Sequence, residues 1–220
     1  MMKWEAAFRV VAHELRSPAG VIGGYARMLQ SGRLDETGRE EALKQLERAA
    51  GRLGDLAQQS SDLAGWLDPH ADDTHQVLTV GNILARAALG AAAPDLVRVI
   101  DSDASSLCVR TREPRALSAA FSSLIDATSR EMERRGSEIA IASRRGPGPG
   151  SCEVIVGSPA VINDVKMDAG GDSKFNLEGG GLGLHMILGA VVLDAHGATL
   201  WASRDVRAVN GVRLPVTAGS

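Results

Sequence analysis

The sequence predicts an α+β protein in two parts, an antiparallel helical hairpin followed by an α/β sandwich. Through the first part, apolar residues recur at steps of four and three, as they do in packed helices. From about residue 77, short strand-like runs alternate with helical runs. Aromatic residues make up only 3% of the chain, while Leu and Ala supply most of its apolar side chains, which favours helices over a β-sandwich.

Residues 1–68 are predicted to form two long helices joined by a turn at residues 31–38 (SGRLDETG). The first seam comprises Trp4, Phe8, Val11, Leu15, Pro18, Ile22, Tyr25 and Leu29, and the second Leu46, Ala50, Leu53, Ala57, Ser60, Ala64 and Leu67. Such helices form an antiparallel hairpin. One hairpin buries only one face, so we expect two copies to pair into a four-helix bundle, a homodimer through residues 1–68.

Residues 69–76 (PHADDTHQ) are polar and are expected to form a linker, and residues 77–220 are expected to form the α/β sandwich. The sandwich should have helices on one face of a sheet. Strands are expected at 77–80, 96–100, 106–111, 138–145, 151–158, 198–204 and 211–216, and helices at 82–93, 114–135 and 182–196.

Composition and charge exclude several classes of function. The net charge of −3 gives no reason to expect a nucleic-acid or membrane partner. No apolar run approaches the roughly 20 residues of a membrane-spanning helix, so no membrane insertion is expected. The two cysteines, Cys108 and Cys152, fit neither a disulfide framework nor a zinc cluster. We expect both to be buried in strands of a cytoplasmic protein.

His13 stands out in the first helix. The heptad assigns it to position f, furthest from the seam, where it could be an ordinary surface histidine. Its neighbours favour a reactive role: Glu14 could orient the imidazole through one ring N–H while the other nitrogen attacks. Pro18 removes a hydrogen bond in the helix interior at a cost of about 3 kcal/mol, and a helix that tolerates this often uses the bend. An exposed imidazole is a nucleophile near neutral pH, and phosphorus is a suitable electrophile.

The run HELRSP (13–18), followed by GYARML (24–29), resembles the phosphoacceptor box of two-component sensor histidine kinases. The resemblance implies that His13 is the phosphorylated residue, Glu14 its acid–base partner and Pro18 the source of a helix bend. Ser17 stands where many members carry a Thr or Asn implicated in dephosphorylation. In that family the dimeric hairpin is followed by an ATP-binding α/β sandwich, so the resemblance implies a histidine-kinase ATPase-type domain at residues 77–220.

GGGLGLHMI (179–187) resembles the family's second glycine box. The resemblance implies that Gly179, Gly181, Gly183 and Leu184 approach nucleotide phosphates, since glycines admit a close backbone and the following helix offers its N-terminal amides. The spacing excludes a dinucleotide fingerprint, because a leucine occupies the place of the third glycine. A loop without any ligand stays an alternative. Arg130, where the family often has Lys, could hold a phosphate.

Other positions depart from the family pattern. The segment 113–130 resembles D-P-x-R-L…N-L-L-x-N-A, and the ungapped match places Ala127 where an Asn holds Mg²⁺. A register shift of one would offer Asp126 but would displace the matched apolar residues. Ser158 stands about where an aspartate reads adenine, and it lacks the charge of a carboxylate. Residues 166–181 should form a mobile lid. We therefore expect a degenerate nucleotide site without a metal ligand.

Three functions follow. In the first, a histidine phosphotransferase exchanges a phosphoryl group between His13 and a response-regulator receiver aspartate. It needs no cofactor beyond the Mg²⁺ that the receiver brings, and an upstream sensor kinase would be a second partner. The alternatives are an active histidine kinase that phosphorylates itself from Mg-ATP, and a non-catalytic pseudokinase regulator. Phosphoryl transfer from ATP depends on positioning and metal-assisted charge neutralisation, so the degenerate site favours the phosphotransferase.

Overall fold

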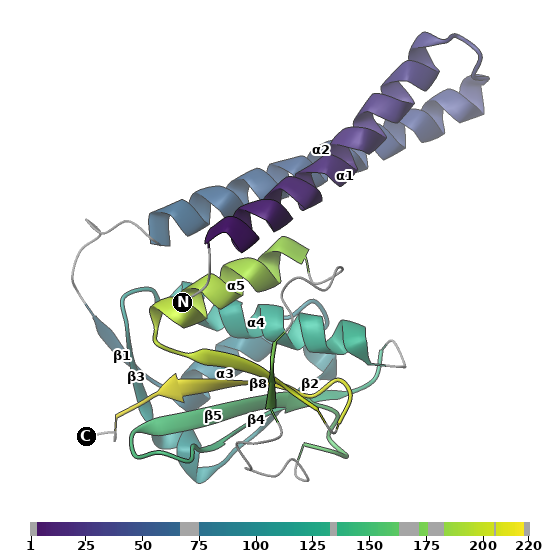
Figure 1. Ribbon diagram of the computed structural model, residues 1–220. Helices are drawn as coiled ribbons and strands as arrows, with labels where there is room; N and C mark the ends of the chain where they lie inside the picture. Colours follow the sequence, from purple (N-terminus) through teal and green to yellow (C-terminus); the bar gives the residue numbers. More distant parts are fainter. Residues whose placement is uncertain are drawn as a thin grey trace. The chain divides into compact units, whose positions relative to one another are not determined.

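The computed structural model describes residues 4–66, 75–132, 136–162, 172–175, 183–204 and 206–217. The chain divides into two compact units, one from Lys3 to His70 and one from Ala71 to the C-terminus. The first unit is all helical, and the second combines helices with strands (Figure 1). The predicted α+β class, with a helical part followed by an α/β part, is confirmed.

The first unit is an antiparallel hairpin of α1 (Trp4–Gln30) and α2 (Glu36–Trp66). The hydroxyl of Ser31 donates to the carbonyl oxygen of Met28 at 2.7 Å, and Gly32 follows with a positive φ of 65°. Asp35 then accepts the N–H of Gly38 at 2.8 Å, as a helix N-cap does. Because Asp35 starts the second helix, the turn is shorter than the predicted 31–38.

The hairpin buries few side chains by itself. Among its described side chains only Pro18, Ala42 and Ala49 are buried. Large apolar side chains stay accessible: Leu15 is 38% exposed and Leu43 is 57% exposed. A single hairpin therefore gains little from the burial of apolar surface.

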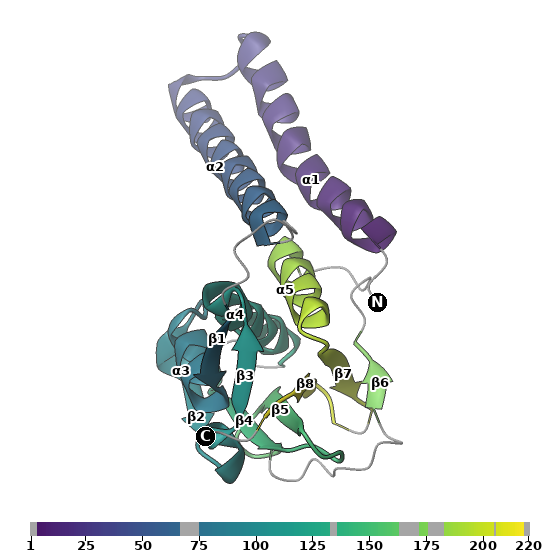
Figure 2. The same cartoon turned by 90° about the vertical axis from the view of Figure 1, so that its left-hand side faces the viewer.

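The second unit holds two sheets (Figure 2). A six-stranded sheet has the order β2-β4-β5-β8-β7-β6, with β2 parallel to β4 and the other pairs antiparallel, and a separate two-stranded sheet pairs β1 with β3. The strands are β1 (Gln76–Thr79), β2 (Val97–Ile100), β3 (Cys108–Thr111), β4 (Ile139–Arg145), β5 (Ser151–Gly157), β6 (Asp172–Lys174), β7 (Thr199–Ser203) and β8 (Asn210–Pro215). The helices are α3 (Val80–Leu89), α4 (Pro114–Glu131) and α5 (Gly183–Ala195), with 3₁₀ turns at Pro94–Leu96 and Asp103–Ser106.

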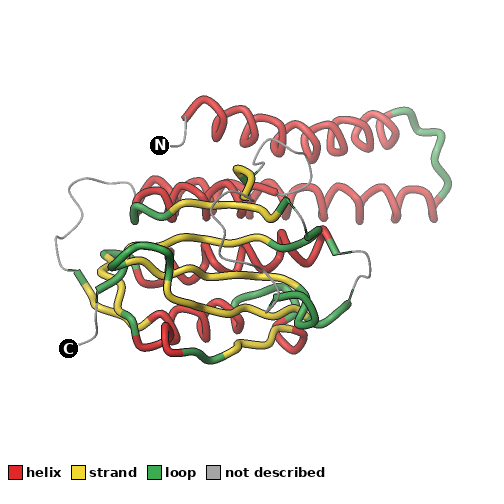
Figure 3. Tube along the Cα trace, turned by 60° about the horizontal axis from the view of Figure 1, so that its bottom comes forward, coloured by secondary structure: helices red, strands yellow, loops and turns green. Residues whose placement is uncertain are grey.

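The three helices pack on one face of the large sheet, as predicted (Figure 3). Leu117, Phe121 and Leu124 of α4 are fully buried. Helices α4 and α5 lie close together because Gly189 has no side chain: a Cβ there would come within 3.1 Å of the Cα of Ala120. Pro114 begins α4 at the first helical position, where its missing N–H costs nothing.

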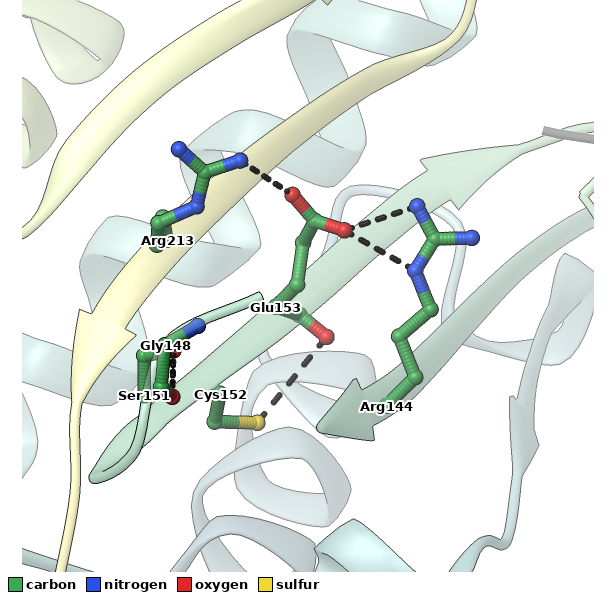
Figure 4. A network of polar contacts seen from close by, with 6 residues as sticks. All are labelled: Arg144, Gly148, Ser151, Cys152, Glu153 and Arg213. Atoms are coloured by element: carbon green, nitrogen blue, oxygen red, sulfur yellow. Dashed lines mark hydrogen bonds and ion pairs between the residues drawn. The ribbon is translucent and has the colours of Figure 1, made fainter. Parts of the chain in front are cut away.

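An ion-pair triad ties the middle of the large sheet together (Figure 4). Glu153 of β5 is opposite Arg144 of β4 and Arg213 of β8. Its side chain is only 3% exposed, and its Oε2 accepts from Nη2 of Arg144 at 2.7 Å and from Nε at 2.9 Å. Its Oε1 accepts from Nη2 of Arg213 at 3.0 Å. A buried carboxylate of this kind is tolerated because two cations satisfy it.

Several expectations need correction. β1 and β3 do not join the main sheet but pair with each other, with Thr79 opposite Cys108. β1 begins at Gln76, the last residue of the predicted linker, and the rest of that linker up to residue 74 lies outside the described residues. Within the expected mobile lid at 166–181, Asp172–Lys174 form β6 and pair with β7.

The expectation for the two cysteines holds. Cys108 and Cys152 are buried in β3 and β5. None of the helices in the described ranges combines the length and the apolar character needed to cross a bilayer.

Candidate functional site

The HELRSP segment lies within α1, helical at every position from 13 to 18. The side chain of His13 lies outside what the structure describes. Glu14 is half-buried, Ser17 is exposed, and the ring of Pro18 is buried. The motif therefore presents polar side chains beside a buried proline.

Pro18 alters the backbone next to the histidine. In an α-helix the carbonyl of residue 14 accepts the N–H of residue 18, and a proline has no N–H to give. The carbonyl of Glu14, one residue after His13, therefore lacks its helical partner. The sequence places this carbonyl in the same turn as the predicted phosphoacceptor.

Ala127, the position that the family match assigns to the metal ligand, lies in the C-terminal half of α4 and is fully buried. Beside it, Asn210 of β8, 1% exposed, donates from Nδ2 to Oγ1 of Thr128 at 3.1 Å and to Oε2 of Glu131 at 2.9 Å. Sequence analysis missed this network. Its signal is an amide in the otherwise apolar inward pattern of β8, which the strand periodicity could have revealed.

Asp126, the alternative ligand, points to another part of the domain. Its Oδ1 accepts the N–H of Ala92 at 2.9 Å, which ties α4 to the segment after α3. Its backbone carbonyl accepts from Nε of Arg130 at 3.1 Å. Asp126 and Arg130 share the wall of a cavity of about 440 Å³ with His185.

At the position that the family match assigns to the metal ligand, the side chain carries no oxygen. Mg²⁺ requires oxygen ligands in near-octahedral geometry, and Ala127 supplies none. One oxygen of Asp126 and one of Glu131 are already hydrogen-bonded. Across the described ranges, no group of three His, Cys, Asp or Glu side chains could hold a metal ion.

Ser158 follows β5 in a tight turn. Its carbonyl accepts the N–H groups of Val161 at 3.0 Å and Ile162 at 3.1 Å. It lines a cavity of about 350 Å³ together with Glu131 from the end of α4. Ala208 lines the same cavity with a φ of 55°, a left-handed conformation that costs a non-glycine residue about 1 kcal/mol. Ala127 is not among the lining residues, so the two substituted positions do not meet there.

The second glycine box is described only in part. Gly183 is the first residue of α5, followed by Leu184, whose side chain lies outside the described residues. Gly179 and Gly181 also lie outside them. His196 has a structural role: its ring nitrogens contact the carbonyl of Val192 at 2.7 Å and Oγ1 of Thr111 at 2.8 Å.

Comparison by sequence finds no relative: no family model matches, and no curated protein does. Comparison by structure is informative. Acinetobacter baumannii histidine kinase AdeS is 15% identical with a TM-score of 0.56, covering 93% of this chain and 98% of that one. Histidine kinase ThkA, solved in complex with response regulator protein TrrA, is 15% identical with a TM-score of 0.53. ShkA, solved at full length in complex with AMPPNP, is 14% identical with a TM-score of 0.54.

These likenesses differ in extent. The ThkA match covers 94% of this chain but only 60% of ThkA, and the ShkA match covers all of this chain but only 47% of ShkA. The AdeS match runs over nearly all of both chains. The chain therefore has the fold of the sensor histidine kinases, with a helical hairpin followed by the α/β domain of that family.

Proposed function

We propose that this chain is a two-component signalling protein that carries a phosphoryl group on His13 and exchanges it with a receiver-domain aspartate. The observation that carries the proposal is the HELRSP motif on the first helix of a hairpin, in a chain with the histidine-kinase fold. Neither the motif nor the fold would suffice alone, because one fold can host several functions.

The chemistry needs only a nucleophile and a proton acceptor. A ring nitrogen of neutral His13 attacks the phosphorus of the receiver's aspartyl phosphate, so a P–N bond forms, the P–O bond breaks and the receiver carboxylate leaves. The other ring nitrogen then loses its proton, and Glu14 is the neighbouring base. The Mg²⁺ that neutralises the phosphoryl oxygens would come with the receiver. The reverse reaction follows the same path.

Two observations support the proposed partners. ThkA was solved in complex with a response regulator, which supports a receiver domain as the partner of this chain. The apolar side chains that a single hairpin leaves exposed, Leu15, Val21, Met28 and Leu43, support a homodimer through residues 1–68.

The α4 helix favours phosphotransfer over self-phosphorylation from ATP. Ala127 has no oxygen to offer a metal ion, and the nearby carboxylates of Asp126 and Glu131 each have one oxygen engaged in a hydrogen bond. Without a metal ligand, the charge of a transferring γ-phosphoryl group would be poorly neutralised.

An active kinase is the second candidate. ShkA was solved with AMPPNP, and α5 begins at Gly183 directly after a glycine-rich run, as a phosphate-binding helix does. A kinase of this kind would label His13 from Mg-ATP without any receiver. A non-catalytic regulator would do neither reaction.

One experiment separates the three functions. The full chain is incubated with γ-labelled ATP and Mg²⁺, and separately with labelled phosphoreceiver. His13→Ala is the test variant, and His75→Ala, an exposed histidine of the other unit, is the matched control. We expect label from the receiver only, acid-labile and absent in His13→Ala. Label from ATP would establish the kinase, and label from neither source would leave the regulator.

A further inference from the structure

Two arginines line one cavity of the α/β domain. The cavity, about 380 Å³, is bounded by α3, α4 and the first turn of α5. Arg86 comes from the last turn of α3 and Arg115 from the start of α4, and both are exposed. Within the described part of the chain, the guanidinium of neither arginine makes a hydrogen bond or ion pair. Arg144 and Arg213, in contrast, are both paired with a carboxylate.

The backbone that presents these arginines is held firmly. Ser122 of α4 donates from Oγ to the carbonyl of Ala87 in α3 at 2.9 Å. At Gly90, which ends α3, an added Cβ would come within 2.8 Å of that Oγ, so the close approach depends on glycine. An arginine on a helix that is fixed in this way loses less conformational entropy when it binds a ligand than an arginine on a mobile loop does.

The rest of the wall presents hydrogen-bond acceptors. Ser118 and Ser123 each donate their hydroxyl hydrogen to a carbonyl one turn earlier, at 3.0 and 2.9 Å, which leaves their oxygens free to accept. Asp126, which also lines the cavity, has one oxygen engaged with a backbone N–H and a second that can accept. The cavity wall therefore combines two cationic donors with neutral and anionic acceptors.

We propose that this cavity binds an organic phosphate monoester that also carries hydroxyl groups. Arg86 and Arg115 would hold the phosphate, because two forked guanidiniums match its oxygens, and an anion between them relieves their mutual repulsion. The hydroxyls would donate to the serine oxygens and to Asp126. The volume lies within the usual range for small-molecule sites, about 300 to 1,000 Å³.

Apart from Asp126, the alternative metal ligand of the family match, this site shares no residue with those named in the proposed function. Ala127 and Ser158 do not line the cavity, and His13 belongs to the other unit. Binding to the cavity should therefore be the same in His13→Ala as in the original chain. A failed phosphotransfer experiment would leave the cavity proposal standing, and the reverse also holds.

The test uses glucose 6-phosphate as the probe, titrated into the full chain and followed by calorimetry. We expect saturable binding that weakens as salt is raised, with glucose and inorganic phosphate each binding more weakly than the ester. Arg86→Gln with Arg115→Gln should weaken binding about tenfold or more, since each removes charge-assisted hydrogen bonds. Arg98→Gln with Arg110→Gln is the matched control, because both are exposed arginines outside the cavity.

Circular dichroism checks that the variants fold, and each single arginine variant is read separately if the pair does not. The proposal is overturned if glucose 6-phosphate does not bind at millimolar concentration. Equal weakening by the control pair would also overturn it, since that would indicate diffuse charge attraction. Inorganic phosphate binding as tightly as the ester would overturn the role assigned to the hydroxyl groups.

Discussion

In the α/β domain, Leu117, Phe121 and Leu124 of a single helix are fully buried, whereas the described side chains of the hairpin include only three buried ones, Pro18 and two alanines. The domain thus closes a core within one chain. The hairpin aligns two long helices but leaves much of their apolar surface accessible. The unit that carries the predicted phosphoacceptor is therefore the one that buries less apolar surface by itself.

The largest effect is expected from a substitution that leaves a cavity in the core of the α/β domain. Leu124→Ala should lower the free energy of unfolding by about 2–5 kcal/mol, because Leu124 is fully buried in α4 and its loss leaves a cavity. Urea unfolding can be followed by the fluorescence of Trp201, which is buried in this domain, with Trp4 and Trp66 replaced by Phe. Leu89→Ala, at a side chain 78% exposed, should change the same transition by no more than about 0.5 kcal/mol. Equal effects of the two variants would contradict the core assigned here.

A second test removes the buried charge of the large sheet. Glu153→Gln leaves Arg144 and Arg213 without their carboxylate. We expect the free energy of unfolding to fall by about 2–3 kcal/mol. The loss is smaller than for a fully buried ion pair because both arginine side chains are partly exposed to solvent. Glu138→Gln, at an exposed carboxylate before β4, is the control and should have almost no effect. Thermal unfolding of both variants checks this. A stabilised Glu153→Gln protein would show that desolvation outweighs the ion pairs.

Local signals explain which elements the sequence could predict. The second hairpin helix begins next to an N-cap, Asp35, and α4 begins at Pro114, so both starts lay close to the predicted ones. The end of α4 was predicted at residue 135 and lies at Glu131. The apolar periodicity of a sequence can continue beyond the last residue of the helix that packs against the domain. It therefore predicts helix ends less well than capping residues predict helix starts.

Strand pairing was harder to predict, because it depends on residues far apart in the sequence. Nothing local to Gln76–Thr79 or Cys108–Thr111 indicates that these strands leave the main sheet. The same holds for the candidate sites. The role of Glu153 is visible only once β4 and β8 are known to flank β5, and Asn210 meets Thr128 across 82 residues of sequence. The histidine motif, in contrast, is contiguous in the sequence and could be predicted directly from it.

A smaller effect concerns the buried thiol of β5. Burial raises the pKa of Cys152 to about 11 from an ordinary value of 9.0. Between these values the unfolded chain releases the proton and the folded chain keeps it, so the free energy of unfolding falls as the pH rises from 9 to about 11. The expected decrease is on the order of 2 kcal/mol. It is measured as the difference in urea midpoint between the original chain and Cys152→Ala, which should lack this dependence. Parallel pH profiles would refute the assignment.

The smallest effect is expected from a substitution on the exposed surface of the hairpin. Leu43, Ala50 and Ala57 follow one another at steps of seven on α2 and are all exposed, with Leu43 at 57%. Within one hairpin, Leu43→Ala should therefore be almost neutral. If a second copy covers this stripe, the truncation removes buried apolar area worth about 1 kcal/mol, and the dimer should dissociate several times more readily. Sedimentation equilibrium of the full chain measures this, with the equally conservative Leu89→Ala as control. A chain that is monomeric at every concentration would refute the four-helix bundle, and an unchanged dimer would place its interface on another face of the hairpin.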